Sequence, residues 1–345
     1  MRKEGIEDLV KNNNVKEIIR DRPVSISLSD TISMIDADDV HQKSINGTSI
    51  DGRRVSVCVI DTGVAYTHSA FGSCANTTDI NDGSCPKVVG GYDFVNNDLN
   101  PLDDNGHGTH VAGIIASDDA VYKGIAPQAG IVAIKSLDNN GSGFESDVAS
   151  GIEWCISNAT LLNISVISMS LGEGQYTDAD CPSTFDSVIN TANALGIMVV
   201  AASGNNNNPH ALSSPACSPN VTSVGAVTKS DSIPSFSNSH SILDLLAPGV
   251  SVVSAVPPES YCTGNPGEAS CSDSLFISLQ GTSMATPHVA GAAALIYQYE
   301  DLLNSRNATP SGIENILKRT GVQIYDARNS ISFPRIAVLD TIIAV

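Results

Sequence analysis

Apolar stretches of two kinds alternate along most of the chain. Runs of five to seven mostly apolar residues fit buried strands and are separated by longer stretches with helical spacing. The expected strands are 55–60, 131–136, 166–171, 198–202, 221–227, 242–246 and 251–256. The expected helices are 107–117, 144–158, 184–195, 284–299 and 309–320. This alternation predicts an α/β fold, with three αβα layers around a mostly parallel central sheet.

Three glycine-containing motifs place polar side chains at the ends of these elements. Asp61 ends an apolar strand in VCVIDTG (57–63), at the sheet edge where open α/β folds hold their chemistry. His107 opens a helix in NGHGTHVAG, and Ser283 opens a buried helix in GTSMATPHVAG. The free N–H groups of a helix start favour negative charge, so Ser283 could attack a carbonyl there and help to hold the oxyanion. Ordinary helix capping by Ser283 is the alternative.

Together the three motifs resemble those of the subtilisin-like serine proteases, in the same order of aspartate, histidine and serine. The resemblance implies that His107 accepts the proton of Ser283, and that Asp61 fixes the tautomer of His107. His110 and His288 lie in the same motifs, and we expect them to serve packing or supporting hydrogen bonds.

A fourth motif, VVAASGN, ends in Asn205. The resemblance assigns the side-chain amide of Asn205 to the developing oxyanion, so the expected catalytic set is Asp61, His107, Asn205 and Ser283. The alternative for Asn205 is a turn residue, because 205–209 reads as a loop.

Three short segments resemble the substrate-binding parts of subtilisins. Two of them match the walls of the primary specificity pocket, and the third matches the edge that pairs with extended substrate. Ordinary turns are the alternative for any one segment. Ser213 is expected near the pocket floor, and no acidic residue takes its place there. This indicates a broad preference for large apolar or neutral side chains. The expected substrate-binding residues are Gly141, Ser142, Gly143, Ser170, Leu171, Gly172, Ala202, Ser203 and Gly204.

The acidic loop before His107 resembles a calcium-binding loop of thermitase-like subtilases. Calcium prefers six to eight oxygen ligands, and this loop is rich in carboxylates and amides. A solvated acidic loop is the alternative, because Asn96 stands where the pattern has a carboxylate. The expected ligands are Asp93, Asn96, Asp98 and Asn100, with Asp103 or Asp104 as further contributors.

The net charge and the cysteines limit which partners and which cellular compartment fit this chain. The net charge is −19, which argues against nucleic-acid binding, and no apolar run is long enough to span a membrane. Eight cysteines without a Cys-x-x-Cys motif indicate an oxidising compartment, and we expect a secreted monomer. Spacing suggests the local pairs Cys74–Cys85 and Cys262–Cys271, and the family resemblance adds Cys181–Cys217. Cys58 and Cys155 could be bridged or free.

The chain is expected to hold one peptidase domain, residues 29–345. Residues 1–28 contain a strand-like alternation at 24–28 and have two interpretations, a remnant of the family's inhibitory propeptide or an N-terminal extension. The function expected from the resemblance is a secreted serine endopeptidase acting on proteins or peptides, with the propeptide as its own inhibitor. Two alternatives use the same fold: a peptide ligase or macrocyclase, which would need an additional element over the site, and an inactive binding protein. The insertions between Cys74 and Cys85 and between Cys262 and Cys271 are the candidates for that element, and neither looks helical.

Overall fold

A nine-stranded sheet forms the centre of the molecule. The computed structural model describes residues 28–72, 74–258, 275–303 and 308–345. The strands of the sheet are β3 (Ser56–Asp61), β4 (Val88–Asp93), β5 (Gly130–Lys135), β6 (Ile164–Met169), β8 (Met198–Ala202), β10 (Thr222–Val227), β11 (Leu245–Pro248), β14 (Val322–Asp326) and β15 (Ile331–Arg335). Their order is β14-β15-β11-β10-β8-β6-β3-β5-β4, and only the β14–β15 pair is antiparallel.

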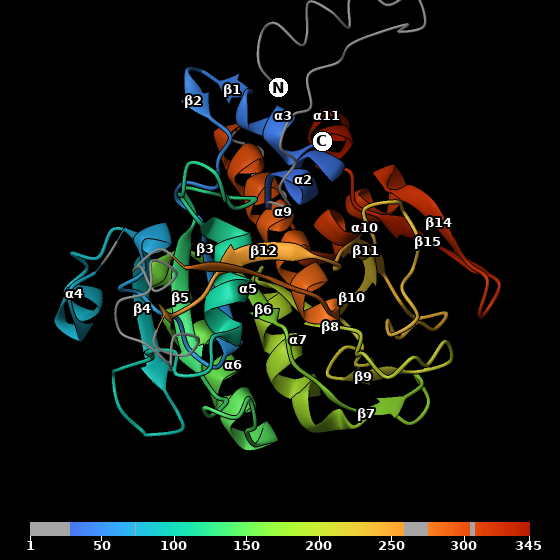
Figure 1. The fold of residues 1–345 in the computed structure, drawn as a ribbon, viewed down its shortest axis with the longest axis horizontal. Coiled ribbons are helices and arrows are strands. Elements are labelled where there is room, and N and C mark those ends of the chain that lie inside the picture. The colour runs from blue at the N-terminus through green and yellow to red at the C-terminus, as the bar shows by residue number, and fades with distance from the viewer. Residues whose placement is uncertain (1–27, 73, 259–274, 304–307) are drawn as a thin grey trace, which may run out of the picture.

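Helices cover both faces of this sheet, which confirms the expected three-layer arrangement (Figure 1). The longer helices are α5 (His107–Ala116), α6 (Glu145–Leu162), α7 (Asp186–Ala194), α9 (Thr282–Leu302) and α10 (Pro310–Thr320). The short ones are α2 (Leu28–Met34), α3 (Ala37–His41), α4 (Thr77–Asn81), α11 (Val338–Ala344) and the 3-10 turns η1 (Ser69–Phe71) and η2 (Ser183–Phe185). α5 and α9 pack on one face, and α6 and α7 pack on the other.

The alternation of side chains along β3 explains the two cores. Val57 and Val59 point into the core shared with α5 and α9, whereas Cys58 and Ile60 point into the core shared with α6. Every residue of β3 is buried, as expected for a central parallel strand that is covered on both faces.

The chain changes direction around β3. β4 and β5 lie on one side of β3, and the chain then crosses to β6 and β8 on the other side. Connections that leave neighbouring strands in opposite directions open a crevice at the carboxyl ends of those strands. Asp61 ends β3 and Ser170 directly follows β6, so this topology brings both to that crevice.

Three two-stranded antiparallel sheets stand apart from the central one. They pair β1 (Ser44–Ile45) with β2 (Thr48–Ser49), β7 (Glu173–Tyr176) with β9 (Leu212–Ser214), and β12 (Val252–Ala255) with β13 (Phe276–Leu279). The β7–β9 ribbon matters most for function, because it follows directly on the segment after β6.

The boundaries differ from the prediction where helix and strand signals meet. The helix expected at 144–158 continues to Leu162, and the strand expected at 166–171 begins at Ile164. Asn163 ends α6 in a left-handed conformation, with φ of 54°. β4 was not predicted because two glycines interrupt its pattern. A Cβ at Gly91 would lie only 2.3 Å from the carbonyl oxygen of Ala133 on β5, so this strand needs a glycine there.

The structure settles most of the cysteine pairing. It confirms the predicted Cys74–Cys85 and Cys181–Cys217 bridges. It also joins Cys58 on β3 to Cys155 on α6, a pair that the sequence left open. Cys262 and Cys271 lie outside the described residues.

The insertion closed by the Cys74–Cys85 bridge was expected to lack helix. It contains the short helix α4, because the Asn76 side chain accepts hydrogen bonds from the N–H groups of Thr78 and Asp79 at its start. This corrects the expectation for that loop.

The N-terminal part of the described chain belongs to the domain. Ile32 and Ile35 are buried, and the Arg335 guanidinium donates to the Met34 carbonyl oxygen. α2 and α3 lie beside the C-terminal α11 (Figure 1). The strand-like run expected at 24–28 falls outside the described residues except for Leu28, which begins α2. Within the described chain, no helix combines the length and apolar character needed to cross a bilayer.

Candidate active site

His107 and Asp61 meet across the junction of α5 and β3. The His107 Nδ1 atom lies 2.7 Å from Asp61 Oδ1, which also accepts the Thr62 N–H at 2.8 Å. The carboxylate of Asp61 is fully buried, whereas 27% of the His107 side chain is exposed. Because a carboxylate only accepts hydrogen bonds, Nδ1 carries the hydrogen and Nε2 is left free to accept a proton.

Asp61 also sets the protonation of His107. Burial alone would lower the pKa of His107, but the charge and hydrogen bond of Asp61, helped by the charge of Asp103, raise it above 6.5. The other two histidines of the motifs behave differently. Burial lowers the pKa of His110 to about 3 and that of His288 to about 4, so both stay neutral at neutral pH. They hydrogen-bond backbone carbonyls, as expected for packing residues.

A buried carboxylate that the sequence did not single out for catalysis holds this junction together. Asp103 Oδ1 accepts the Thr62 hydroxyl and the N–H groups of Asn105 and Gly106, and its Oδ2 accepts the N–H and hydroxyl of Thr109. Asp103 therefore caps the helix that carries His107 and ties it to the residue after Asp61. The signal was its position four residues before His107, just ahead of a helix start. These bonds occupy both oxygens of the Asp103 carboxylate, which the sequence had offered as a further calcium ligand.

The close approach of α5 to β3 depends on a glycine and a buried lysine. A Cβ at Gly108 would lie 2.2 Å from the Gly63 carbonyl oxygen, so no other residue fits. Lys135 is only 1% exposed, and its Nζ atom donates to Asp104 Oδ1 at 2.6 Å and to the Thr62 carbonyl oxygen at 2.9 Å. This lysine ties the end of β5 to the turn that follows Asp61.

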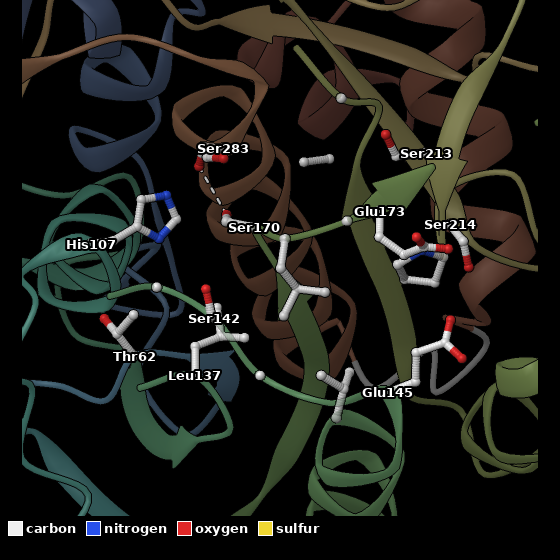
Figure 2. A pocket seen from close by; sticks show the side chains of 18 of the residues that line it. Thr62, His107, Leu137, Ser142, Glu145, Ser170, Glu173, Ser213, Ser214 and Ser283 are labelled. Atoms are coloured by element: carbon white, nitrogen blue, oxygen red, sulfur yellow. Dashed lines mark hydrogen bonds between the residues drawn. The ribbon is translucent and has the colours of Figure 1, made fainter. Parts of the chain in front are cut away.

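Ser283 lies in the first turn of α9, and a proline determines how its backbone is held. Pro287 has no N–H, so the Ser283 carbonyl lacks the helical hydrogen bond from residue i+4. The Ser170 hydroxyl supplies that bond at 2.8 Å (Figure 2). Ser170 is 3% exposed and follows β6, so it fixes the start of α9 against the central sheet.

Asn205 faces the same helix start with its amide group oriented. Its Oδ1 atom accepts the Thr282 N–H at 2.9 Å, and because that partner can only donate, the Nδ2 atom must point the other way. A Cβ built on Gly281 would lie 3.4 Å from Asn205 Nδ2 and 3.7 Å from the Ser283 backbone nitrogen. The Asn205 Nδ2 atom and the Ser283 backbone nitrogen therefore lie near the same point beside Gly281, a placement that is compatible with an oxyanion site.

These groups share one pocket of about 680 Å³ (Figure 2). His107, Asn205 and Ser283 all line it, and Asp61 is buried behind His107. A histidine ready to accept a proton, a helix-start hydroxyl and two convergent donors fit acyl transfer through a serine nucleophile.

A comparison with protein families agrees with this geometry. The model described as the subtilase family matches residues 52–332, which is most of the chain. The chain belongs to the subtilase family.

Known subtilases resemble it over most of its length. The Thermophilic serine proteinase of Bacillus sp. (strain AK1) is 42% identical over 244 residues, which cover 70% of this chain and 51% of that protein. Subtilisin DY of Bacillus licheniformis is 37% identical over 301 residues, covering 86% of this chain and 92% of that protein. This chain thus spans about half the length of the first relative and nearly all of the second.

A solved structure of a cold adapted subtilisin-like serine proteinase matches this subtilase with a TM-score of 0.65 and 35% identity. The match covers 86% of this chain and 96% of that chain. The resemblance therefore extends through the fold as well as the motifs.

The subtilase pocket contains eight of the nine residues expected to bind substrate. Gly141, Ser142 and Gly143 form an exposed edge, where the Asp138 N–H donates to the Ser142 carbonyl oxygen at 2.8 Å. Ser203 is the exception, because it is fully buried and its hydroxyl donates to the Asn238 carbonyl oxygen. The others that line the pocket are Ser170, Leu171, Gly172, Ala202 and Gly204.

The pocket also contains residues that the motifs did not mark. Ser213 lines it as expected, but its hydroxyl donates to the Gly174 carbonyl oxygen at 3.1 Å. Glu145 and Glu173 line it as well, although neither lies inside a recognised motif. Their positions directly after Gly143-Phe144 and Gly172 were the only signal in the sequence.

The expected calcium ligands lie at the end of β4, where Asp93 is the last residue, and on the loop that follows it. The Asp93 carboxylate accepts the backbone and side-chain N–H groups of Asn96 at 2.9 and 2.8 Å, and Asp98 Oδ1 accepts the Asn100 N–H. The Asn100 side-chain oxygen accepts the Tyr66 hydroxyl. In the part of the chain that the structure describes, no three acidic, histidine or cysteine side chains gather as a metal site. The loop has the oxygen chemistry of a calcium site, but here both Asp93 oxygens, Asp98 Oδ1 and the Asn100 side-chain oxygen accept N–H or O–H groups.

Proposed function

We propose that this subtilase is a secreted serine endopeptidase that hydrolyses peptide bonds through an acyl-enzyme on Ser283. The observation that carries the proposal is the pairing of His107 with buried Asp61, in the same pocket as Ser283 and the oriented Asn205 amide.

The proposed reaction has two half-cycles, formation and hydrolysis of the acyl-enzyme, and the same groups serve in both. Ser283 Oγ attacks the substrate carbonyl carbon while His107 Nε2 takes the hydroxyl proton. The oxyanion receives hydrogen bonds from Asn205 Nδ2 and the Ser283 N–H. His107 then gives its proton to the departing amine, and a water molecule hydrolyses the ester with His107 as base. Asp61 keeps its charge throughout and stabilises the imidazolium.

The pocket lining supports a broad preference for large apolar or neutral side chains. Apolar side chains contribute much of its surface, and small polar residues contribute most of the rest. The edge at 141–143 leaves backbone exposed, so an extended peptide can pair with it as an added strand. The apolar lining residues are Leu137, Phe144, Val148, Leu171, Phe185 and Ala202.

The cysteines support the proposed location. Three disulfides join described residues, and such bonds persist in oxidising compartments. We propose that the protein acts there as a monomer on protein or peptide substrates. For residues 1–28 we keep both interpretations, and inhibition of the mature enzyme by a peptide of this sequence would favour the propeptide.

We also propose that the loop bearing Asp93 and Asp98 binds a structural calcium ion, with Asn96 and Asn100 as the amide ligands. The charge and oxygen content of the loop support the proposal. Binding would require Asn96 to turn its amide nitrogen away from Asp93, because both Asp93 oxygens now accept N–H groups.

The main proposal is tested with the full chain, unfolded casein and a fluorophosphonate probe. We expect casein cleavage and probe labelling, and both should disappear in Ser283→Ala while Ser146→Ala, an exposed serine of α6 outside the pocket, behaves like the unmodified protein. Labelling of Ser283→Ala would show that another residue is the nucleophile. Labelling without casein cleavage would contradict endopeptidase activity and favour the ligase.

A further inference from the structure

Two carboxylates line the pocket beside Ser283, and no lysine or arginine lines it among the described residues. They are Glu145 at the start of α6 and Glu173 at the start of β7. Figure 2 shows both on the side of the pocket opposite His107. The substrate pocket therefore carries negative charge where side chains of a bound peptide would lie.

The β7–β9 ribbon fixes the place of Glu173. Glu173 pairs with Ser214 in this ribbon, and Ser213 beside it donates its hydroxyl to the Gly174 carbonyl oxygen. Gly172, the residue before Glu173, belongs to the pocket wall that runs from Ser170. Glu173 thus stands where that wall meets the end of the pocket formed by 213–215.

Among the described residues, no cationic side chain forms an ion pair with Glu173. Its Oε1 atom accepts the Tyr176 hydroxyl at 2.8 Å, a neutral donor, and this hydrogen bond raises the pKa of Tyr176. Glu145 likewise accepts only a hydroxyl, that of Thr184 at 3.2 Å. Neither glutamate forms an ion pair within the described part of the chain. The second oxygen of each carboxylate stays available to a ligand.

We propose that Glu173 is a specificity-determining residue that favours a lysine or arginine side chain at the substrate residue whose carbonyl Ser283 attacks. The inference rests on the proposed endopeptidase function and adds an electrostatic selection to its broad preference. Leu171 and Ala202 line the same pocket as Ser283 and Glu173, so they can pack on the methylene stem while the cationic head reaches Glu173. Glu145 adds to the negative potential of the pocket without meeting this side chain directly.

The expected ranking follows from charge and burial. Among side chains of similar size, cationic ones come first and acidic ones come last, because acidic ones meet Glu173 with the same charge. The broad preference for large apolar or neutral side chains remains beside this charge selection. Exposed ion pairs are weak, and Glu173 is exposed, so the preference should be about two- to fivefold rather than absolute. It should also weaken in high salt, which screens such pairs.

The test compares two peptide substrates that differ only in charge, with arginine or its neutral isostere citrulline at the attacked residue. The measured quantity is the ratio of their kcat/KM values. We expect a ratio of about two to five, falling towards one in Glu173→Gln and in 1 M salt. Glu173→Lys should reverse the order of a second pair, so that glutamate is cleaved faster than glutamine. Glu153→Gln is the matched control, because Glu153 is exposed on α6 and does not line the pocket.

Two results would overturn the inference while leaving the proposed function intact. One is a ratio near or below one in an enzyme that cleaves casein. The other is a high ratio that Glu173→Gln leaves unchanged, or that only Glu145→Gln removes. A protein that cleaves neither casein nor any peptide, and whose Ser283 is not labelled, would instead contradict the proposed function itself.

Discussion

The two sides of the pocket are built in opposite ways. The side with His107 and Ser283 is fixed by buried hydrogen bonds that join α5, α9, β3 and β6, including those of Asp103 and Ser170. The side with 141–144 and Glu173 is exposed and held by local contacts, such as the Ser142 N–H to Asp138 Oδ1. Reacting groups need fixed distances, whereas side chains that select substrate can vary without disturbing them.

The difference teaches where change is tolerated. Substitution on the exposed side should alter which peptides are cleaved and leave the fold intact. Substitution on the buried side should lower the rate for every peptide, because the same bonds position the reacting atoms.

The largest effect is expected from the oxyanion donor. Asn205→Asp keeps an acceptor for the Thr282 N–H but loses the Nδ2 donor and adds negative charge, so kcat should fall about 10²- to 10³-fold with little change in KM. Steady-state kinetics on one neutral peptide measures this. A variant with unchanged kcat would show that Asn205 only holds Thr282. Asn205 would then not belong to the reacting groups on the buried side of the pocket.

The next effect is a pH dependence set by His107. Its pKa is raised above 6.5, and only the neutral form can accept the Ser283 proton, so kcat/KM should fall about tenfold per unit below that pKa. Asp61→Asn should lower the apparent pKa as well as the rate. The free energy of unfolding changes with pH in the opposite direction. The His107–Asp61 pair stabilises the fold fully at pH values below the pKa that His107 has in the unfolded chain. This contribution is lost as pH rises through the raised pKa of His107 in the folded protein. A profile that is flat from pH 5 to 9 would contradict His107 as the base.

A smaller effect should distinguish positioning from chemistry. In Asp103→Asn, the new side-chain NH2 group would face backbone N–H groups that now donate to the Asp103 carboxylate. We therefore expect the free energy of unfolding to fall by about 2 kcal/mol and kcat to fall about tenfold. The substitution should also lower the apparent pKa of His107, since the charge of Asp103 helps to raise it. Asp178→Asn, an exposed residue, is the control in both assays. Lost stability with an unchanged pH profile would leave Asp103 a purely structural role.

The smallest effect concerns the acidic loop, which belongs to neither side of the pocket. If calcium binds there, chelation should lower Tm by about 2–4 °C for each kcal/mol of binding stabilisation, and Asp98→Asn should abolish the difference. Differential scanning calorimetry with and without chelator checks this. An unchanged Tm would remove the calcium proposal and leave a loop stabilised by its own hydrogen bonds.

The sequence alone predicted the elements whose local signals agree. The helix expected at 309–320 is α10, which begins at Pro310 with Thr309 as its N-cap, and the strand expected at 55–60 is β3, shifted by one residue. It failed at β4, where Gly90 and Gly91 remove the apolar signal because the neighbouring strand and helix leave no room for side chains. Such a constraint comes from residues distant in sequence and leaves no local pattern.

The motifs also determined the family and the candidate catalytic set, because helix starts and strand ends confine those side chains to known backbone positions. Only the tertiary structure decided which distant groups hold them: Asp103 at the helix of His107, Ser170 on the carbonyl that Pro287 leaves free, and Cys155 opposite Cys58. It also decided that Glu173 faces the substrate pocket. Local sequence fixes where a side chain sits on its own element, but its partners depend on how the elements pack.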